Sequence, residues 1–356
     1  MTSRKRVLAA FAHEEPDRVP AWCGASPQFI AKAKAHLGIE TTEDLFIRFG
    51  DDFRRVKAPY AGPAHRHPSL GLPEGAACRT VFGVEHRGMG CGMPVNPPLA
   101  DASLKQVHEY DWPDPKWIDV SQVRAQASVW GRKYAILGGD WSHFWHDANE
   151  LLGMENLMCA MHDAPEIVDA IMDHVLEYYL QVNERIFASA ADLIDVFFIG
   201  NDFGSRGGPL ISPAMFRRFI FPHLQRLTGL GHDYGLKVMM HCCGSFTPLM
   251  PAMVEAGIDG LQALQPCTPD MAPANLKARF GSKLLFNGCI DSHHVLIDGK
   301  PELVQKKTQE VLEIMKPGGG YVLSASHDYI LEETPVENVL AMFDAGRQFG
   351  GYESRL

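Results

Sequence analysis

The tetrapeptide His241-Cys242-Cys243-Gly244 combines residue types and a spacing that suit chemistry. In a strand, residues two apart share a face, so His241 and Cys243 can point together while Cys242 points into a helix layer. An imidazole and a thiolate are a good ligand pair for zinc, but two ligands alone make a weak site. A hydrogen-bonded histidine beside a packed thiol, without metal, is an equal alternative. The candidates for a third ligand are, in order, His327 and Cys289, with Asp328, Glu150 and Asp202 as further donors.

Short apolar runs, each ending in a polar or glycine-containing turn, predict the strands that would position these residues. Arg54, Arg55 and Lys57 interrupt the second run, which is the weakest. Helical periodicity lies between the runs and is clearest from Pro165 onward. Strands that alternate with helices imply a parallel sheet, and eight such units close into a barrel of about 250 residues. The predicted strands span residues 18–23, 53–58, 134–138, 193–199, 237–240, 260–264, 283–286 and 321–323.

The fold class predicted for residues 1–356 is therefore α/β, as a single (β/α)₈ (TIM) barrel domain. Residues 1–17 are expected to add an N-terminal helical extension. Residues 59–128 are rich in proline and glycine, with a hairpin expected across 79–87. We interpret this insertion as a cap over the barrel mouth, and a surface excursion without a role is the alternative.

Barrel enzymes carry their catalytic groups at the carboxyl ends of the strands, so polar residues there are expected to converge on one pocket. Asp140 and Asp291 could instead cap the helices that follow them. His143 and His146 lie three apart after the third strand, where the neighbouring aromatic residues favour packing and substrate contact over metal binding. The strand-end residues are Cys23, Asp140, Asn201, Asp202, His241, Cys243, Gln265, Asp291, His327 and Asp328.

Composition narrows the class of protein. Apolar residues make up 46% of the 356 residues, enough for a sizeable core, and the net charge of −10 argues against a nucleic-acid surface. No signal peptide and no apolar run long enough to cross a membrane are seen, which predicts a cytoplasmic protein. The eight cysteines are then expected to be reduced thiols. The helical outer layer could form a homodimer, although no stripe of residues demands one.

Nine short motifs occur in a set order over nearly the whole chain. They are Glu15-Pro16-Asp17-Arg18-Val19-Pro20, Trp112-Pro113-Asp114-Pro115, Asn201-Asp202-Phe203-Gly204, Gly208-Pro209-Leu210-Ile211-Ser212-Pro213, His241-Cys242-Cys243-Gly244, Asn287-Gly288-Cys289-Ile290-Asp291, Lys316-Pro317-Gly318-Gly319-Gly320, Ser326-His327-Asp328 and Thr334-Pro335-Val336-Glu337-Asn338. By their order and spacing, rather than by any one segment, the chain resembles the uroporphyrinogen decarboxylase superfamily, and within it the cobalamin-linked methyltransferase branch.

The resemblance implies a (β/α)₈ barrel, in agreement with the strand pattern. The decarboxylase branch grips tetrapyrrole carboxylates with an arginine-rich signature near its N-terminus, but residues 22–27 here contain no arginine. The methyltransferase branch binds zinc through His-x-Cys and a distant Cys. His241 and Cys243 match the first part, whereas His327 stands at or beside the distant position. The resemblance therefore implies a zinc set of His241, Cys243 and His327, or the loss of the metal.

Three functions from different classes fit these residues. The first is a methyltransferase, in which zinc activates a thiol or a methylated small molecule and a corrinoid on a partner protein exchanges the methyl group. The second is a metal-free decarboxylase or lyase for a small carboxylic acid, with His327 as general acid, Asp328 orienting it and Asp202 facing developing positive charge. The third is a non-catalytic binding protein. The expected substrate-binding residues are Asn201, Gln265, Asp140, His143 and Arg206.

Overall fold

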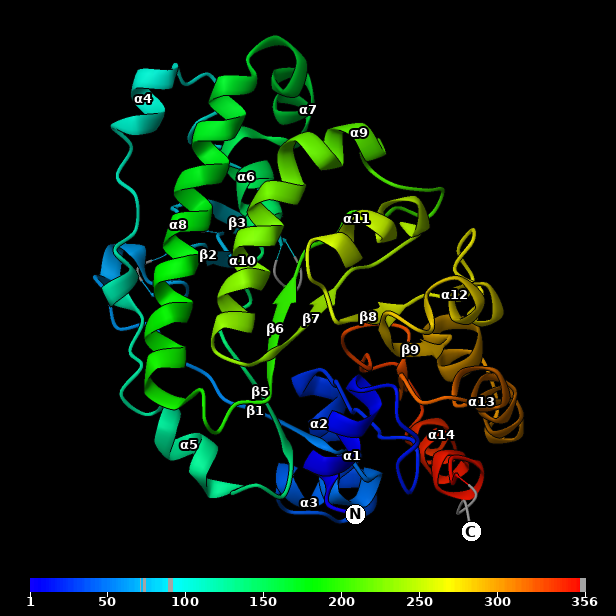
Figure 1. The fold of residues 1–356 in the computed structure, drawn as a ribbon. Coiled ribbons are helices and arrows are strands. Elements are labelled where there is room, and N and C mark those ends of the chain that lie inside the picture. Colours follow the sequence, from blue (N-terminus) through cyan, green and yellow to red (C-terminus); the bar gives the residue numbers. More distant parts are fainter. Residues whose placement is uncertain (71, 73–74, 89–91, 353–356) are drawn as a thin grey trace.

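Seven parallel strands form one curled sheet at the centre of the molecule (Figure 1). The computed structural model describes residues 1–70, 72, 75–88 and 92–352. Within this sheet the strands lie side by side in the order in which they occur along the chain, with the strands of a separate small sheet falling between the first and the second in sequence. In order, the strands are β1 (Phe53–Arg55), β5 (Ala135–Gly138), β6 (Val196–Gly200), β7 (Lys237–His241), β8 (Gly260–Leu264), β9 (Leu285–Ile290) and β10 (Tyr321–Ala325).

The predicted first strand, residues 18–23, is an extended segment that lies between β10 and β1. Trp22 N–H donates to the Leu323 carbonyl, and Leu323 N–H donates to that of Pro20. On the other side, Asp52 N–H donates to the Ala21 carbonyl. Proline at position 20 removes one donor, and the pairing is reduced to a single parallel bridge between Ala21 and Leu323. This segment completes the TIM-barrel-like ring that the sequence predicted.

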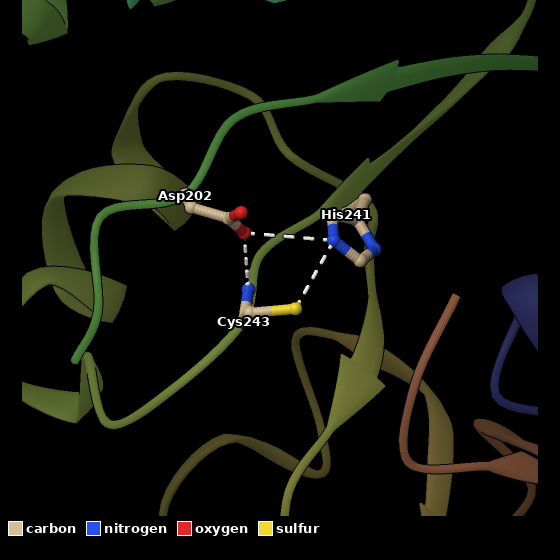
Figure 2. Close-up of side chains that lie close together, drawn as sticks. All are labelled: Asp202, His241 and Cys243. Atoms are coloured by element: carbon tan, nitrogen blue, oxygen red, sulfur yellow. Dashed lines mark hydrogen bonds and ion pairs between the residues drawn. The ribbon is translucent and has the colours of Figure 1, made fainter. Parts of the chain in front are cut away.

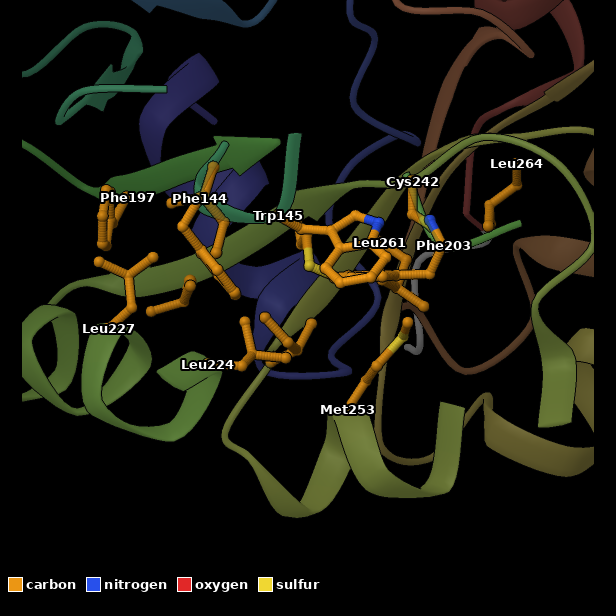
Figure 3. Packing of buried hydrophobic residues seen from close by; sticks show 14 of the residues in the cluster. Phe144, Trp145, Phe197, Phe203, Leu224, Leu227, Cys242, Met253, Leu261 and Leu264 are labelled. Atoms are coloured by element: carbon orange, nitrogen blue, oxygen red, sulfur yellow. The ribbon is translucent and has the colours of Figure 1, made fainter. Parts of the chain in front are cut away.

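The core consists of two hydrophobic clusters. One fills the barrel interior, and the other fills the layer between the sheet and the helices. On β7, Met239 belongs to the interior cluster, whereas Val238, Met240 and Cys242 belong to the outer one. Figure 3 shows Cys242 among side chains from the surrounding helices and strands. The alternation along β7 confirms that His241 and Cys243 share the inner face. At the opposite end of the barrel, α1 inserts Val7 and Phe11 into the interior cluster.

Helices cover the outside of the sheet, and the long helix α8 runs the length of one side (Figure 1). α8 begins at Pro165, as the periodicity predicted. The helices are α1 (Ser3–Phe11), α2 (Pro27–Leu37), α3 (Thr42–Phe49), α4 (Leu104–His108), α5 (Val123–Val129), α6 (Phe144–Leu152), α7 (Met154–Asp163), α8 (Pro165–Ala190), α9 (Pro213–Met215), α10 (Phe221–Asp233), α11 (Met250–Glu255), α12 (Pro273–Phe280), α13 (Pro301–Met315) and α14 (Val336–Phe349), with π-helical turns η3 (Phe216–Ile220) and η5 (Ser292–Ile297).

The insertion at 59–128 carries its own small antiparallel sheet, which contains the expected hairpin. Strands β2 (Cys78–Arg79), β3 (Glu85–Arg87) and β4 (Met93–Pro94) pair in that order. His86 on β3 lies 3.0 Å from Glu150 on α6, and Phe82 packs edge-on against Tyr178 of α8. The insertion therefore rests on the helices that follow β5. Its role as a cap stays a prediction.

The seven cysteines in the described part of the chain are free thiols, as expected, and Cys91 lies outside it. They are Cys23, Cys78, Cys159, Cys242, Cys243, Cys267 and Cys289.

Candidate active site

Three side chains from two adjacent strands converge at the carboxyl end of the barrel (Figure 2). His241 is the last residue of β7, and Cys243 follows it by two. Asp202 follows β6, whose last residue, Gly200, pairs with His241 across the sheet. Cys243 Sγ lies 3.2 Å from His241 Nε2, and Asp202 Oδ1 lies 3.5 Å from the same nitrogen. The backbone N–H of Cys243 also donates to Asp202 Oδ1 at 2.6 Å, which fixes the carboxylate beside the thiol.

Gln262 on β8 sets the tautomer of His241. Its Oε1 lies 2.6 Å from His241 Nδ1, and a carbonyl oxygen can only accept, so Nδ1 carries the proton. In the neutral imidazole, Nε2 then presents its lone pair toward Cys243 and Asp202. A metal-binding histidine is oriented in the same way, by an acceptor on its other ring nitrogen.

The geometry of this cluster fits a zinc ion. Usual zinc bond lengths and tetrahedral angles place N, O and S ligand atoms about 3.3–3.6 Å apart. The nitrogen–sulfur and nitrogen–oxygen distances here are 3.2 and 3.5 Å, and all three ligand atoms lie within 4.8 Å of one another. One nitrogen, one sulfur and one oxygen donor would leave a fourth position open, as in catalytic zinc sites. Asp202, His241 and Cys243 are therefore the residues that could hold the metal.

Two glycines make room for this arrangement. A Cβ at Gly244, where φ is +81°, would lie 2.6 Å from the Gly204 backbone, so only glycine permits the tight turn after Cys243. Gln265 supports the same turn by accepting from Gly244 N–H at 3.1 Å. On β6, a Cβ at Gly200 would lie 2.0 Å from the indole of Trp141. Its absence lets Trp141 lie beside His241, with their rings 5.5 Å apart.

Burial dominates the electrostatics of the site. It raises the pKa of the Cys243 thiol, and the charges of Asp202 and Asp328 raise it further. Without a cation the thiol is neutral and can donate to His241. Burial, together with neighbouring His143, lowers the pKa of His146, whose Nε2 accepts from Asp202 N–H at 3.1 Å. Burial thus favours the neutral forms of the His146 imidazole and the Cys243 thiol at this site.

Several residues expected to bind substrate also make hydrogen bonds within the loops at the strand ends. Asn201 is fully buried, accepting from Trp145 N–H and donating to the Ser142 carbonyl. Asp140 accepts from Ser142 N–H, and Asp291 caps the turn that follows it. Arg206 lies exposed on the loop after β6. That Asn201, Gln265, Asp140 and Arg206 contact a substrate stays a prediction.

His143 is not part of the Asp202–His241–Cys243 group, but its ring lies 6.1 Å from that of His146, which lies beside Asp202. Its Nδ1 lies 3.2 Å from the hydroxyl of Tyr179, which donates to the buried Asp147. Together with Asp140 and residues of the insertion, these side chains line a separate cavity of about 260 Å³. Burial raises the pKa of Asp147 well above its usual range.

His327 and Asp328 follow β10, on the far side of β8 and β9 from the cluster. His327 Nδ1 accepts from Tyr329 N–H at 3.2 Å. Its ring is not among the groups whose ligand atoms meet Asp202, His241 and Cys243 within 4.8 Å. Cys289 is buried, within the outer hydrophobic cluster. The arrangement therefore favours Asp202 as the third ligand, and a ligand role for His327 stays a prediction.

Two polar residues inside the barrel were missed by the sequence reasoning. Gln262 and Asn287 are fully buried and lie side by side on the inner faces of β8 and β9. Among the described residues, neither amide atom of Asn287 has a hydrogen-bond partner, and nor does Gln262 Nε2. The sequence feature that could have indicated each of them is a polar residue within an otherwise apolar strand run.

Within the described residues, no helix has both the length and the apolar character needed to span a bilayer.

Comparison with known proteins places these features in a family. A sequence model described as uroporphyrinogen decarboxylase (URO-D) matches residues 139–349, more than half of the chain. A uroporphyrinogen decarboxylase of Syntrophotalea carbinolica is 24% identical over 59% of this chain and 54% of its own length. A methylated-thiol–coenzyme M methyltransferase of Methanosarcina mazei is 23% identical over 56% and 50%. A methylcobamide:CoM methyltransferase of Methanosarcina acetivorans is 20% identical over 52% and 50%.

The chain thus spans about half the length of the curated relatives it matches. A solved structure described as a methyltransferase from Methanosarcina mazei superposes with a TM-score of 0.65 at 19% identity. It covers 98% of this chain and 99% of that one. At this identity the likeness establishes the barrel fold alone.

Proposed function

Because this chain belongs to the uroporphyrinogen decarboxylase family, we propose that it is a zinc-assisted methyltransferase that exchanges a methyl group with a corrinoid on a partner protein. One observation carries the proposal: the donor atoms of Asp202, His241 and Cys243 lie near one another at the barrel mouth, with separations from His241 Nε2 of 3.2 and 3.5 Å, close to those between atoms bound to one zinc ion. Two relatives with methyltransferase names, one of them acting on a methylcobamide, support the reaction class.

Each residue has a defined part in this proposal. His241 Nε2, Cys243 Sγ and Asp202 Oδ1 would hold the ion, and Gln262 would keep the imidazole in the tautomer that metal binding needs. A bound zinc ion would supply a Lewis acid that lowers the pKa of a thiol or polarises a methylated oxygen. Asp328, whose charge reaches the Cys243 thiol, and neighbouring His327 remain available to exchange protons with the leaving group. Expected partners are a small-molecule substrate and a corrinoid protein. A cytoplasmic location and a homodimer stay predictions.

The test is metal content, measured by mass spectrometry on protein purified without chelator. We expect about one zinc per chain in the wild type and its loss in Cys243→Ser. Asp202→Asn and His327→Gln distinguish the two candidate third ligands. Loss of metal in Asp202→Asn with retention in His327→Gln supports the arrangement seen here. A wild-type protein that contains no metal and takes up no added zinc contradicts the proposal.

A metal-free decarboxylase or lyase is the second candidate, and the decarboxylase of Syntrophotalea carbinolica favours it. In that reaction His327, oriented by Asp328, would deliver a proton to the carbon that loses carbon dioxide. Its distinguishing result is turnover of a small carboxylic acid that survives exhaustive chelation and Cys243→Ser but not His327→Gln.

A further inference from the structure

A second cavity lies at the barrel mouth, beside the seam between the extended segment and β1. It encloses about 480 Å³, within the range of small-molecule sites. Its apolar wall is formed largely by flat aromatic and branched side chains, including Trp22, Phe46, Phe53, Trp130 and Leu137. Walls of this composition suit a ligand with a ring-sized apolar body.

Arg55 on β1 supplies the cavity with a cation that is not neutralised. Its guanidinium carbon lies 5.5 Å from the ring centres of both Trp141 and Phe198. No carboxylate in the described part of the chain pairs with it, although the side chain is half-buried. Neighbouring Arg54 is the opposite case, because it makes two bonds of 2.7 Å to Glu43. The two aromatic rings contact the guanidinium group of Arg55 without using its N–H donors. These donors therefore remain available to a ligand.

The acidic groups on the cavity wall do not cancel this charge. Glu43 is engaged by Arg54. Burial raises the pKa of Asp51 to about 7, so that carboxyl is partly protonated near neutral pH. Lys57 adds a positive charge at the rim, and Asp328 is the remaining carboxylate on the wall. An anion at Arg55 therefore faces more positive than negative charge.

This cavity adjoins the candidate metal site. The indole of Trp141 contacts the Arg55 guanidinium and lies 5.5 Å from the His241 ring. Asp328 lines the cavity, and its charge acts on the Cys243 thiol. A ligand anchored at Arg55 would therefore have its other end directed past Trp141 toward the ligands of the metal.

We propose that this cavity binds a small carboxylic acid with a ring-sized apolar body, and that Arg55 holds its carboxylate through a two-point hydrogen bond. The inference rests on the proposed function, because it names the substrate class of the same barrel mouth. Arg55 is then a specificity-determining residue, chosen from geometry, whereas the sequence pointed to Arg206 for this task.

The test compares benzoate with its uncharged analogue benzamide by isothermal titration calorimetry. We expect the wild type to bind one benzoate per chain at least tenfold more tightly than benzamide. Arg55→Gln should bring benzoate affinity down to that of benzamide and leave benzamide unchanged. Arg55→Lys, which keeps the charge but not the fork, should give an intermediate affinity and shows that loss in Arg55→Gln is not a failure to fold.

Arg217→Gln is the matched control, because Arg217 is exposed, pairs with Glu255 on the surface and lies outside the cavity. It should bind benzoate like the wild type. Cys243→Ser should also retain benzoate binding while losing metal, so failure of the zinc proposal is distinguishable from failure of this one. Equal affinities for benzoate and benzamide, no benzoate binding by the wild type, or unchanged benzoate binding by Arg55→Gln would overturn the inference. Inorganic phosphate that displaces benzoate at equal concentration would overturn the carboxylate class.

Discussion

The orientation of His241 depends on one hydrogen bond made by Gln262. We expect Gln262→Leu to lower zinc affinity about 10- to 100-fold, because the imidazole loses the acceptor that fixes its tautomer. Gln262→Glu retains an acceptor and should retain or raise the affinity. Competition with a zinc-binding dye measures both. Equal affinities for the wild type and Gln262→Leu would show that the bond does not orient the imidazole.

For the residues of the site, the sequence correctly predicted which side chains share the inner face of β7, but it did not single out the third ligand. Period-two spacing was enough to place His241 and Cys243 on the inner face and Cys242 on the outer face. The third donor was left open among candidates because the register between strands is not encoded locally. Gly200 pairs with His241, so the residue two beyond it, Asp202, comes to lie beside Cys243. His327 follows β10 and has β8 and β9 between it and that point.

At the scale of the elements, β6 ends in Gly200, and the indole of Trp141 occupies the space that a side chain at this position would fill. Gly200→Ala would force the indole away from β6, because the new Cβ would lie 2.0 Å from it. We expect a loss of about 1–3 kcal/mol in the free energy of unfolding, typical of overpacking, together with a change in near-ultraviolet circular dichroism. Gly207→Ala is the control, since a Cβ there meets nothing within 4 Å. Equal destabilisation by the two changes would contradict this account.

Element boundaries show where local signals suffice. Residues 260–264 were predicted as a strand and form β8, because an apolar run bounded by turn residues marks a buried parallel strand. Ser212 precedes Pro213 and caps α9 by accepting from Met215 N–H, as its residue type favours. Thr334-Pro335-Val336-Glu337 has the sequence spacing of a capping box, but α14 begins one residue later, at Val336. Pro335 occupies the cap position and has no side-chain oxygen to accept a hydrogen bond.

For the whole molecule, Asp51 links stability to pH. Burial raises its pKa to about 7, against about 3.9 in an unfolded chain. The folded state holds the proton more tightly, so this contribution is complete below pH of about 4 and is lost as pH rises through about 7. A shift of this size corresponds to roughly 4 kcal/mol. Arg54, Asp52 and Cys23 are the titratable neighbours.

Asp51→Asn should remove that dependence. The difference in unfolding free energy between variant and wild type should move in the variant's favour by a few kcal/mol (~4) from pH 4 to pH 8. Urea denaturation at the two pH values measures it, and Asp44→Asn, an exposed helix-start carboxyl, controls for the loss of a charge. A constant difference across the range would show that Asp51 is ionised in the folded protein.

The barrel class was predictable from the sequence because alternating strands and helices leave few arrangements that bury both faces of a sheet. How the ring closes was not, since residues 20–22 meet β10 only through contacts about three hundred positions away in the chain. A pairing between residues so far apart in the chain leaves no pattern in the local sequence.

The contact between residues 20–22 and β10 also determines the order in which the strands can pair during synthesis. Every strand from β5 to β10 can pair as soon as it emerges, because its neighbour has already been made. Residues 20–22 instead wait for β10, and Val19 waits for Gly350. Residues 19–22 can therefore pair only after about three hundred further residues have been made. A short covalent link between positions 18 and 351, which already pair, would make this late closure local and faster in a chain that begins at an exposed connection elsewhere.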